Sequence, residues 1–114
     1  MGILTGSMNN NQKCIDECTK CAQACKECFT LCLNEPDVQA RKNCISMLME
    51  CSCICKEAAA FMSMNAQHSK ELCGLCSVIC TKCAQECSMF KDNHCTECSQ
   101  ICNSCADECM KMSK

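Results

Sequence analysis

Six cysteines near the start of the chain follow one another at alternating steps of four and three residues. They are Cys14, Cys18, Cys21, Cys25, Cys28 and Cys32. This alternation keeps side chains on one stripe of an α-helix, because each helical turn takes about 3.6 residues. The residues between them, such as Asp16, Glu17 and Lys20, are mostly polar and would face outward. The segment is therefore predicted to be an amphipathic helix whose inner face consists of thiols.

The same spacing recurs in the second half of the chain, with a sparser version between. The later ladders are Cys73, Cys76, Cys80, Cys83 and Cys87, and then Cys95, Cys98, Cys102, Cys105 and Cys109; the sparse one is Cys44, Cys51 and Cys55. In the sparse ladder, Leu48 and Met62 fill stripe positions. Cys53 falls off the stripe and is predicted to lie outside. Four helices therefore share an interior lined with sulfur.

Few helix-breaking residues interrupt these segments, since the chain has three glycines and one proline. Helices are expected over residues 10–33, 38–64, 66 or 67 to 90, and 94–112. Pro36 ends the first helix, Asp37 is expected to cap the second, and Asp92 or Asn93 the fourth. Short connections force neighbouring helices to run antiparallel. The predicted fold is all-α, an antiparallel up-down-up-down four-helix bundle with a cysteine-lined interior.

The segment 10–114 is expected to form one domain, and residues 1–9 a disordered N-terminal segment, partly a cloning remnant ahead of Met8. A net charge of −2, without Trp or Tyr, gives no support for nucleic acid or a membrane as partner. No stretch approaches the roughly 20 apolar residues of a membrane span. Without a signal-peptide pattern, a cytoplasmic location with free thiols is expected, the alternative being an exported form with its leader removed.

Cysteines four residues apart on one helix are poorly placed for a disulfide. Their Cβ atoms are about 5–6 Å apart, whereas a disulfide needs about 3.8 Å. The gap does suit a soft cation held between two sulfur atoms. Eight CxxxC pairs offer this: Cys14 with Cys18, Cys21 with Cys25, Cys28 with Cys32, Cys51 with Cys55, Cys76 with Cys80, Cys83 with Cys87, Cys98 with Cys102, and Cys105 with Cys109.

Thiolate ligands select Cu(I), zinc or iron–sulfur clusters. Structural zinc needs four converging ligands, which straight helices supply less readily, and iron–sulfur cysteines lie on loops. Two-coordinate Cu(I) makes the weakest geometric demand. Because buried thiolates are costly, the metal-free thiols should be protonated, and sharing of thiolates leads to about one copper per inward cysteine, on the order of twenty. That quantity indicates storage and sequestration.

Other interpretations remain beside the copper store. A zinc or mixed soft-metal thiolate protein is one, and a disulfide-stapled helical scaffold is another. A redox protein is disfavoured, because no single low-pKa CxxC stands at a helix start. No enzymatic activity is expected.

Four helices with CxxxC ladders resemble the bacterial copper storage proteins, and the cytosolic branch in particular. The resemblance rests on CIDEC, CAQAC, the CxxCF step ending at Phe29, and the His94–Cys95 step. It implies a homotetramer that holds many Cu(I) ions inside each bundle, with the nineteen inward cysteines and His94 as metal ligands. Leu48 departs from the carboxylate expected in helix 2 of cytosolic relatives.

The topology gathers different side chains at the two ends of the bundle. Met8, Met62, Met64, His68, Met110 and Met112 share one end, and Met62, Met64, Met110 and Met112 could form a thioether funnel there. His94 belongs to the other end, where it is either a Cu(I) ligand or a helix cap. His68 is interpreted as a surface residue.

Overall fold

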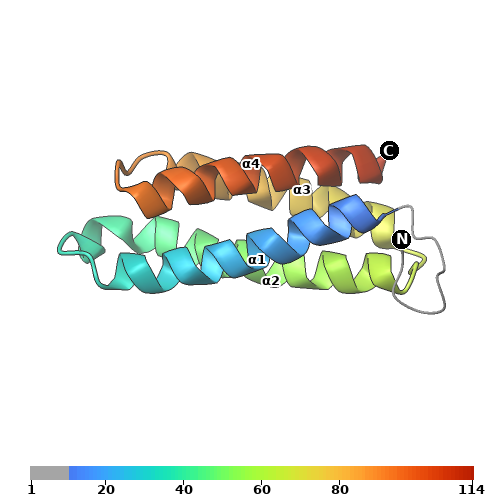
Figure 1. The fold of residues 1–114 in the computed structure, drawn as a ribbon, viewed down its shortest axis with the longest axis horizontal. Helices are drawn as coiled ribbons and strands as arrows, with labels where there is room; N and C mark the ends of the chain where they lie inside the picture. The colour runs from blue at the N-terminus through green and yellow to red at the C-terminus, as the bar shows by residue number, and fades with distance from the viewer. Residues whose placement is uncertain (1–10) are drawn as a thin grey trace.

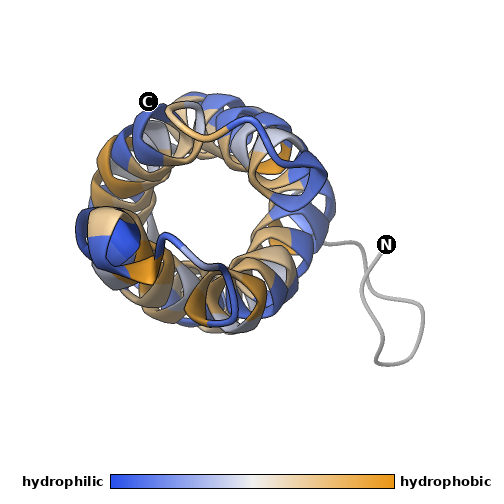
Figure 2. Cartoon of the chain, turned by 90° about the vertical axis from the view of Figure 1, so that its left-hand side faces the viewer, coloured by the Kyte–Doolittle hydropathy of each residue, from blue (hydrophilic) through white to orange (hydrophobic). Residues whose placement is uncertain are grey.

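The computed structural model describes residues 11–114, so the predicted N-terminal segment and Met8 lie outside the described residues. It contains α1 (Gln12–Leu33), the 3-10 helix η2 (Val38–Arg41), α2 (Lys42–Ser63), α3 (Ser69–Cys87) and α4 (Asn93–Ser113). The helices run alternately up and down along a body of 48 × 25 × 17 Å (Figure 1). Viewed end-on they form a ring in which α4 returns to pack on α1 (Figure 2). The predicted all-α four-helix bundle is confirmed.

The first connection differs from its prediction. The α-helical part of α2 begins at Lys42, after η2, and Asp37 caps neither element with its side chain. Asp37 instead accepts a hydrogen bond from Nε of Arg41 at 2.7 Å. The carboxylate therefore pairs with a guanidinium that the same turn brings to it, which competes with capping.

The second connection is longer than predicted, because α2 ends in a left-handed cap. Asn65 has a φ of 51°, and the N–H of Ala66 donates to the carbonyl of Phe61. Asparagine tolerates this conformation better than most residues, and the bond satisfies a carbonyl at the helix end. Helix α3 consequently begins at Ser69 and ends at Cys87, inside the predicted bounds. Helix α4 has the predicted cap, since Asp92 accepts from the backbone N–H of Cys95.

Small residues allow close packing in two pairs of helices, α1 with α2 and α3 with α4. The buried hydroxyl of Ser52 on α2 donates to the carbonyl of Ala22 on α1 at 3.2 Å. Ser77 on α3 donates to Ala106 on α4, and Ser99 on α4 donates back to Ala84 on α3, each at 2.9 Å. These bonds satisfy polar groups that close packing would otherwise leave buried without partners.

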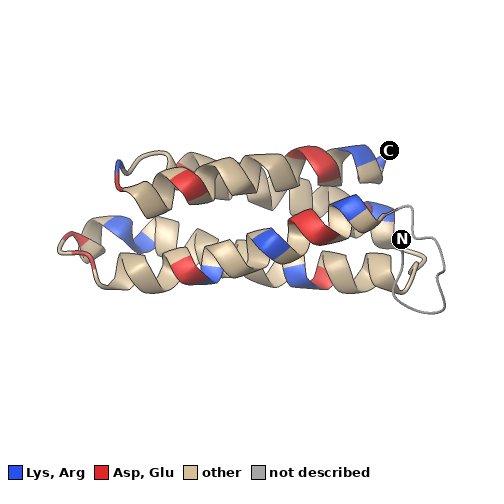
Figure 3. Cartoon of the chain, in the orientation of Figure 1, with Lys and Arg blue, Asp and Glu red and all other residues tan. Residues whose placement is uncertain are grey.

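The core consists mainly of cysteine side chains. Cys53 is exposed and the other nineteen of the twenty cysteines are buried, as the helical stripes predict. Charged residues of both signs alternate along α1 on the outside (Figure 3). Within residues 11–114, Arg41 is the one charged residue that is buried, with 5% of its surface exposed. No described helix is both long enough and apolar enough to span a membrane.

Leu48 is one of the few large aliphatic side chains in this core and has no exposed surface. Changing Leu48→Ala is expected to lower the free energy of unfolding of the reduced, metal-free protein by about 3 kcal/mol, because it leaves a cavity among the thiols. Urea unfolding followed by circular dichroism measures this. Leu31→Ala, at a position that is 47% exposed, is the matched control and should change it by less than about 1 kcal/mol.

Candidate metal centre

The buried cysteine side chains form a continuous column of sulfur along the bundle. The Sγ atoms that contact one another lie 3.5–4.0 Å apart, for example 3.5 Å between Cys18 and Cys109 and 3.7 Å between Cys25 and Cys102. A disulfide bond measures about 2.05 Å, so these are contacts between separate thiols. All twenty cysteines are free.

Contacts across helices are as short as those along a helix. Cys21 Sγ lies 3.9 Å from Cys25 Sγ on α1, 3.9 Å from Cys51 Sγ on α2 and 3.7 Å from Cys102 Sγ on α4. Other pairs along one helix, such as Cys28 with Cys32 and Cys51 with Cys55, are 3.9 and 4.0 Å apart. The contacts of Cys21 thus bring together sulfur atoms from three helices.

The column contains overlapping clusters whose ligand atoms all lie within 4.8 Å of one another. They include Cys14, Cys73 and Cys109; Cys18, Cys76, Cys105 and Cys109; Cys21, Cys55, Cys80 and Cys105; Cys21, Cys25, Cys51 and Cys102; and Cys28, Cys32, His94 and Cys95. The expectation that straight helices supply four converging ligands less readily is wrong here. Four antiparallel stripes facing one axis bring sulfur atoms together at each level.

The surroundings shift the pKa values of the buried thiols in both directions. Neighbouring sulfur atoms, first that of Cys102, together with burial raise the pKa of Cys25. Burial and the Asp92 carboxylate raise the pKa of Cys95. In contrast, hydrogen bonds with neighbouring thiols, first that of Cys102, lower the pKa of Cys98. The metal-free column therefore contains thiols that hold their protons tightly beside thiols that lose them more easily.

His94 faces the sulfur atoms at one end of the column. Its Nδ1 lies 3.6 Å from Cys28 Sγ and 3.7 Å from Cys95 Sγ. Its Nε2 lies 2.8 Å from Asp92 and 3.0 Å from Glu35, so Nε2 carries the hydrogen and donates to these carboxylates. This arrangement fixes the tautomer that leaves the Nδ1 lone pair toward the thiols. Asp92, not His94, caps α4.

Arg41 completes the same end of the column, and the sequence analysis did not single it out. Its Nη1 is 3.5 Å from both Cys32 Sγ and Cys95 Sγ, and its Nη2 donates to Asp92 at 2.7 Å. Burial by itself would raise the pKa of Asp92, but the hydrogen bonds from Arg41 and Cys95 outweigh it and hold that pKa at about 2. The guanidinium also stacks on Phe90, 4.4 Å from the ring centre.

A sequence signal for Arg41 does exist. Arg41 precedes Cys44 by three residues, so it continues the stripe of Cys44, Leu48 and Cys51. Glu35 carries no such signal, because it lies in the connection between α1 and η2.

The methionines do not gather as the thioether-funnel hypothesis requires. Met62 is buried and Met112 is half-buried, but Met64 and Met110 are 67% and 47% exposed. His68 is exposed and pairs with Glu71 at 2.9 Å, in agreement with its interpretation as a surface residue. This end of the described structure therefore offers thiols, chiefly Cys14, Cys73 and Cys109, more than thioethers.

Fold and site together define a class of protein, the four-helix bundle whose interior is a column of thiols clustered closely enough to hold metal ions. Within that class, the chain belongs to the copper storage protein family, whose sequence model matches residues 7–114.

Three relatives illustrate the similarity. The uncharacterized cysteine-rich protein YhjQ of Bacillus subtilis is 38% identical over 85 residues, which cover 75% of this chain and 79% of the relative. The Cu(I)-bound copper storage protein BsCsp3 is 38% identical with a TM-score of 0.86, covering 90% of this chain and 97% of its own. A cytosolic copper storage protein of Streptomyces lividans, in a structure with five coppers, is 32% identical with a TM-score of 0.87 over 90% and 91% of the two chains.

Proposed function

We propose that this protein stores and sequesters many Cu(I) ions inside its bundle through cysteine thiolates. The observation that carries the proposal is the column of buried, free thiols in overlapping clusters. Isolated clusters would suit a few structural ions. Clusters that share Cys21, Cys105 and Cys109 suit metal–sulfur networks in which one thiolate bridges two ions.

Charge favours Cu(I) over zinc in this interior. A zinc ion bound by four thiolates has a net charge of −2, and several in one column would accumulate negative charge away from water. One Cu(I) for each bridging thiolate leaves the column neutral. Two similar proteins are described with copper, one Cu(I)-bound and one with five coppers, which supports this choice.

The proposed ligands are the nineteen buried cysteines and Nδ1 of His94. With metal–sulfur bonds of about 2.3 Å, a linear two-sulfur site needs sulfur atoms about 4.6 Å apart and a three-sulfur site about 4.0 Å. The CxxxC pairs at 3.8–4.0 Å would therefore open slightly by side-chain rotation to hold a two-coordinate ion. Sulfur from the facing helix is close enough to become a third ligand.

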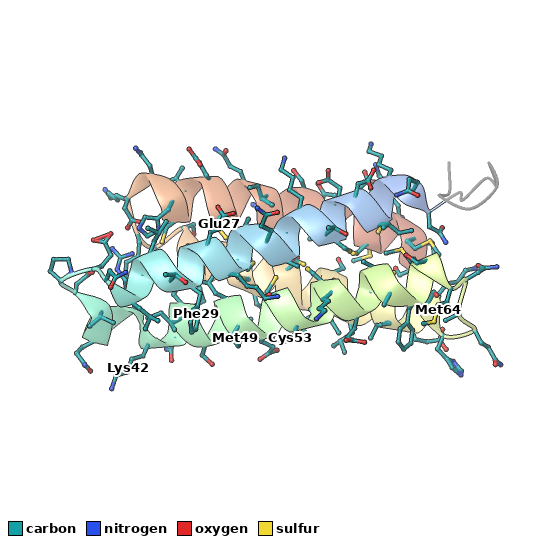
Figure 4. All side chains as sticks on the ribbon, turned by 60° about the horizontal axis from the view of Figure 1, so that its bottom comes forward. Glu27, Phe29, Lys42, Met49, Cys53 and Met64 are labelled. Carbon is teal, nitrogen blue, oxygen red and sulfur yellow. The ribbon has the colours of Figure 1, made fainter. Side chains whose placement is uncertain are left out.

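The relatives and the outer surface support a proposed location and assembly. We propose a cytoplasmic, non-enzymatic store, in line with the cytosolic protein of S. lividans. A homotetramer is proposed from the family resemblance. Its contacts would use the apolar groove between α1 and α2, which includes Phe29, Ile45 and Met49 (Figure 4). Cys53 lies on the outside near this face.

Titration of the reduced protein with Cu(I) against a competing chelator tests the proposal. We expect uptake of on the order of ten to twenty ions per chain. Changing Cys21 and Cys25 to Ser should lower the capacity by only a couple of ions with the helical circular dichroism intact. Cys53→Ser, which removes an exposed thiol, is the matched control and should leave capacity unchanged. Saturation at one or two equivalents would contradict storage, and a thiol count near zero would favour the disulfide scaffold.

A further inference from the structure

A cleft of about 150 Å³ between α1 and α4 leads from the surface to the sulfur column. Glu27 and Glu97 line its outer part, His94 lies along one side, and Cys28 and Cys98 lie at its floor. Both cysteines have 2% of their surface exposed, whereas among the other buried cysteines only Cys14, at 5%, is more exposed and most have no exposed surface. Glu27 lies on the side of α1 that faces α4 (Figure 4). The cleft is thus a place where buried thiols meet solvent beside other metal-ligand side chains.

The nearby end of the bundle offers a poor path for a cation. The guanidinium of Arg41 lies across the last thiols, in contact with Cys32 and Cys95. Asp37 and Asp92 hold it from two sides and Phe90 covers its face. An ion moving along the bundle axis from this end would have to displace this buried, paired side chain from the last thiols.

The donors along the cleft change in the order that a transfer path requires. Carboxylates at the mouth attract cations but bind soft ions weakly, imidazole binds them better, and thiolates bind them best. From the floor, Cys28 Sγ contacts Cys32, Cys95 and His94, so it joins the terminal cluster. Cys98 Sγ lies 4.0 Å from Cys25 Sγ, which belongs to a central cluster. An ion that reaches the floor can therefore pass to either cluster.

We propose that Cu(I) enters and leaves the sulfur column sideways, through the cleft between α1 and α4, with Glu27 and Glu97 as its first contacts. The inference rests on the proposed storage function. No electrons are transferred: each incoming Cu(I) forms bonds to sulfur, and the proton of the thiol that it replaces leaves to water. Glu27 and Glu97 act on the rate of transfer and are not ligands of the stored ion.

A second depression between the same helices supplies a matched control. It includes Glu17 on α1 and Asp107 on α4, but Lys13 and Lys111 also line it and no cysteine does. Removing two carboxylates there changes the net charge of the same helix pair by the same amount. Only the carboxylates of the first cleft lie on a path to a thiol.

The test uses the full-length reduced protein mixed rapidly with Cu(I) as its cationic acetonitrile complex, followed by the ultraviolet absorption of copper–thiolate bonds. The variant Glu27→Gln/Glu97→Gln should take up copper about five- to tenfold more slowly than the wild type at low salt, with the same final capacity. High salt should shrink the difference. The control Glu17→Gln/Asp107→Asn should load at nearly the wild-type rate. Ala24→Phe, which narrows the cleft without a charge change, should also slow uptake.

Equal rates for the two double variants would overturn the lateral path. Faster loading of Arg41→Gln, with no effect of Glu27→Gln/Glu97→Gln, would overturn it in favour of the bundle end. Both results leave the final capacity high, so they are distinct from failure of the storage proposal, in which the wild type itself takes up only one or two ions.

Discussion

Loading the reduced protein with Cu(I) is expected to raise its free energy of unfolding by at least about 8 kcal/mol. Each ion that binds the folded chain and not the unfolded one adds about 4 kcal/mol when its free concentration is a thousand times its dissociation constant. The clusters are assembled from up to four helices, so they exist only in the folded bundle. Two such ions are enough for the stated effect, and further ions add to it.

The gain in the free energy of unfolding should be large because the metal-free core contributes little hydrophobic stabilisation. Its largest fully buried apolar side chains are Leu48 and Met62, and the remaining fully buried large positions are cysteines. A thiol buries less apolar surface than a leucine, so the hydrophobic contribution per residue is small. Metal–sulfur bonds between helices would take over the role that larger side chains have in an ordinary bundle.

Thermal unfolding of the metal-free and the loaded protein, followed by circular dichroism under reducing conditions, measures the effect. For a chain of about 100 residues, a gain of this size corresponds to a midpoint higher by several tens of degrees. Removal of copper with an excess of chelator should restore the original midpoint. Equal midpoints for the two forms would show that copper binds outside the bundle interior.

The burial of nineteen cysteines and the exposure of Cys53 could be predicted because the direction of a helical side chain depends on sequence position alone. The same rule also distinguishes the buried methionine at this end of the bundle from the exposed ones. Met62 continues the stripe of Cys51 and Cys55, whereas Met64 lies two residues on and faces solvent. The funnel hypothesis ignored this difference and considered only which end of the bundle each methionine occupies.

The spacing of cysteines along each helix could not predict which cysteines contact one another across helices. They depend on how far each helix is shifted along its neighbour, which the connections set. These connections include the turn at Asn65, after which α3 begins later than predicted, and the η2 segment, which was not predicted. The sequence therefore indicated pairs of thiols along each helix, while the structure shows clusters from several helices.

Arg41 was missed for a different reason. A charged residue beside a proline-containing connection is usually exposed, because burial of a charge requires partners. Its partners Asp37 and Asp92 lie in two connections far apart in the sequence. Only the folded bundle brings the two carboxylates together around one guanidinium.

Lowering the pH from 7.5 to 5.5 is expected to weaken Cu(I) binding about 100-fold for each proton that an ion displaces. Burial and Asp92 raise the pKa of Cys95 above its ordinary value, so this thiol is protonated across the whole range. Copper must displace that proton, and a higher proton concentration therefore favours the metal-free form. Lower pH should weaken copper binding at Cys25 and Cys87 too, because their pKa values are also raised.

Proton release gives the most direct measurement. In weakly buffered solution at pH 7.5, each Cu(I) added should release about one proton if thiolates are shared between ions, and about two if each ion holds its own pair. Cys53→Ser should give the same ratio, because its thiol lies outside the column. Binding without proton release, or with an affinity independent of pH, would mean that the buried thiols are not the ligands, and the storage proposal would then fail with them.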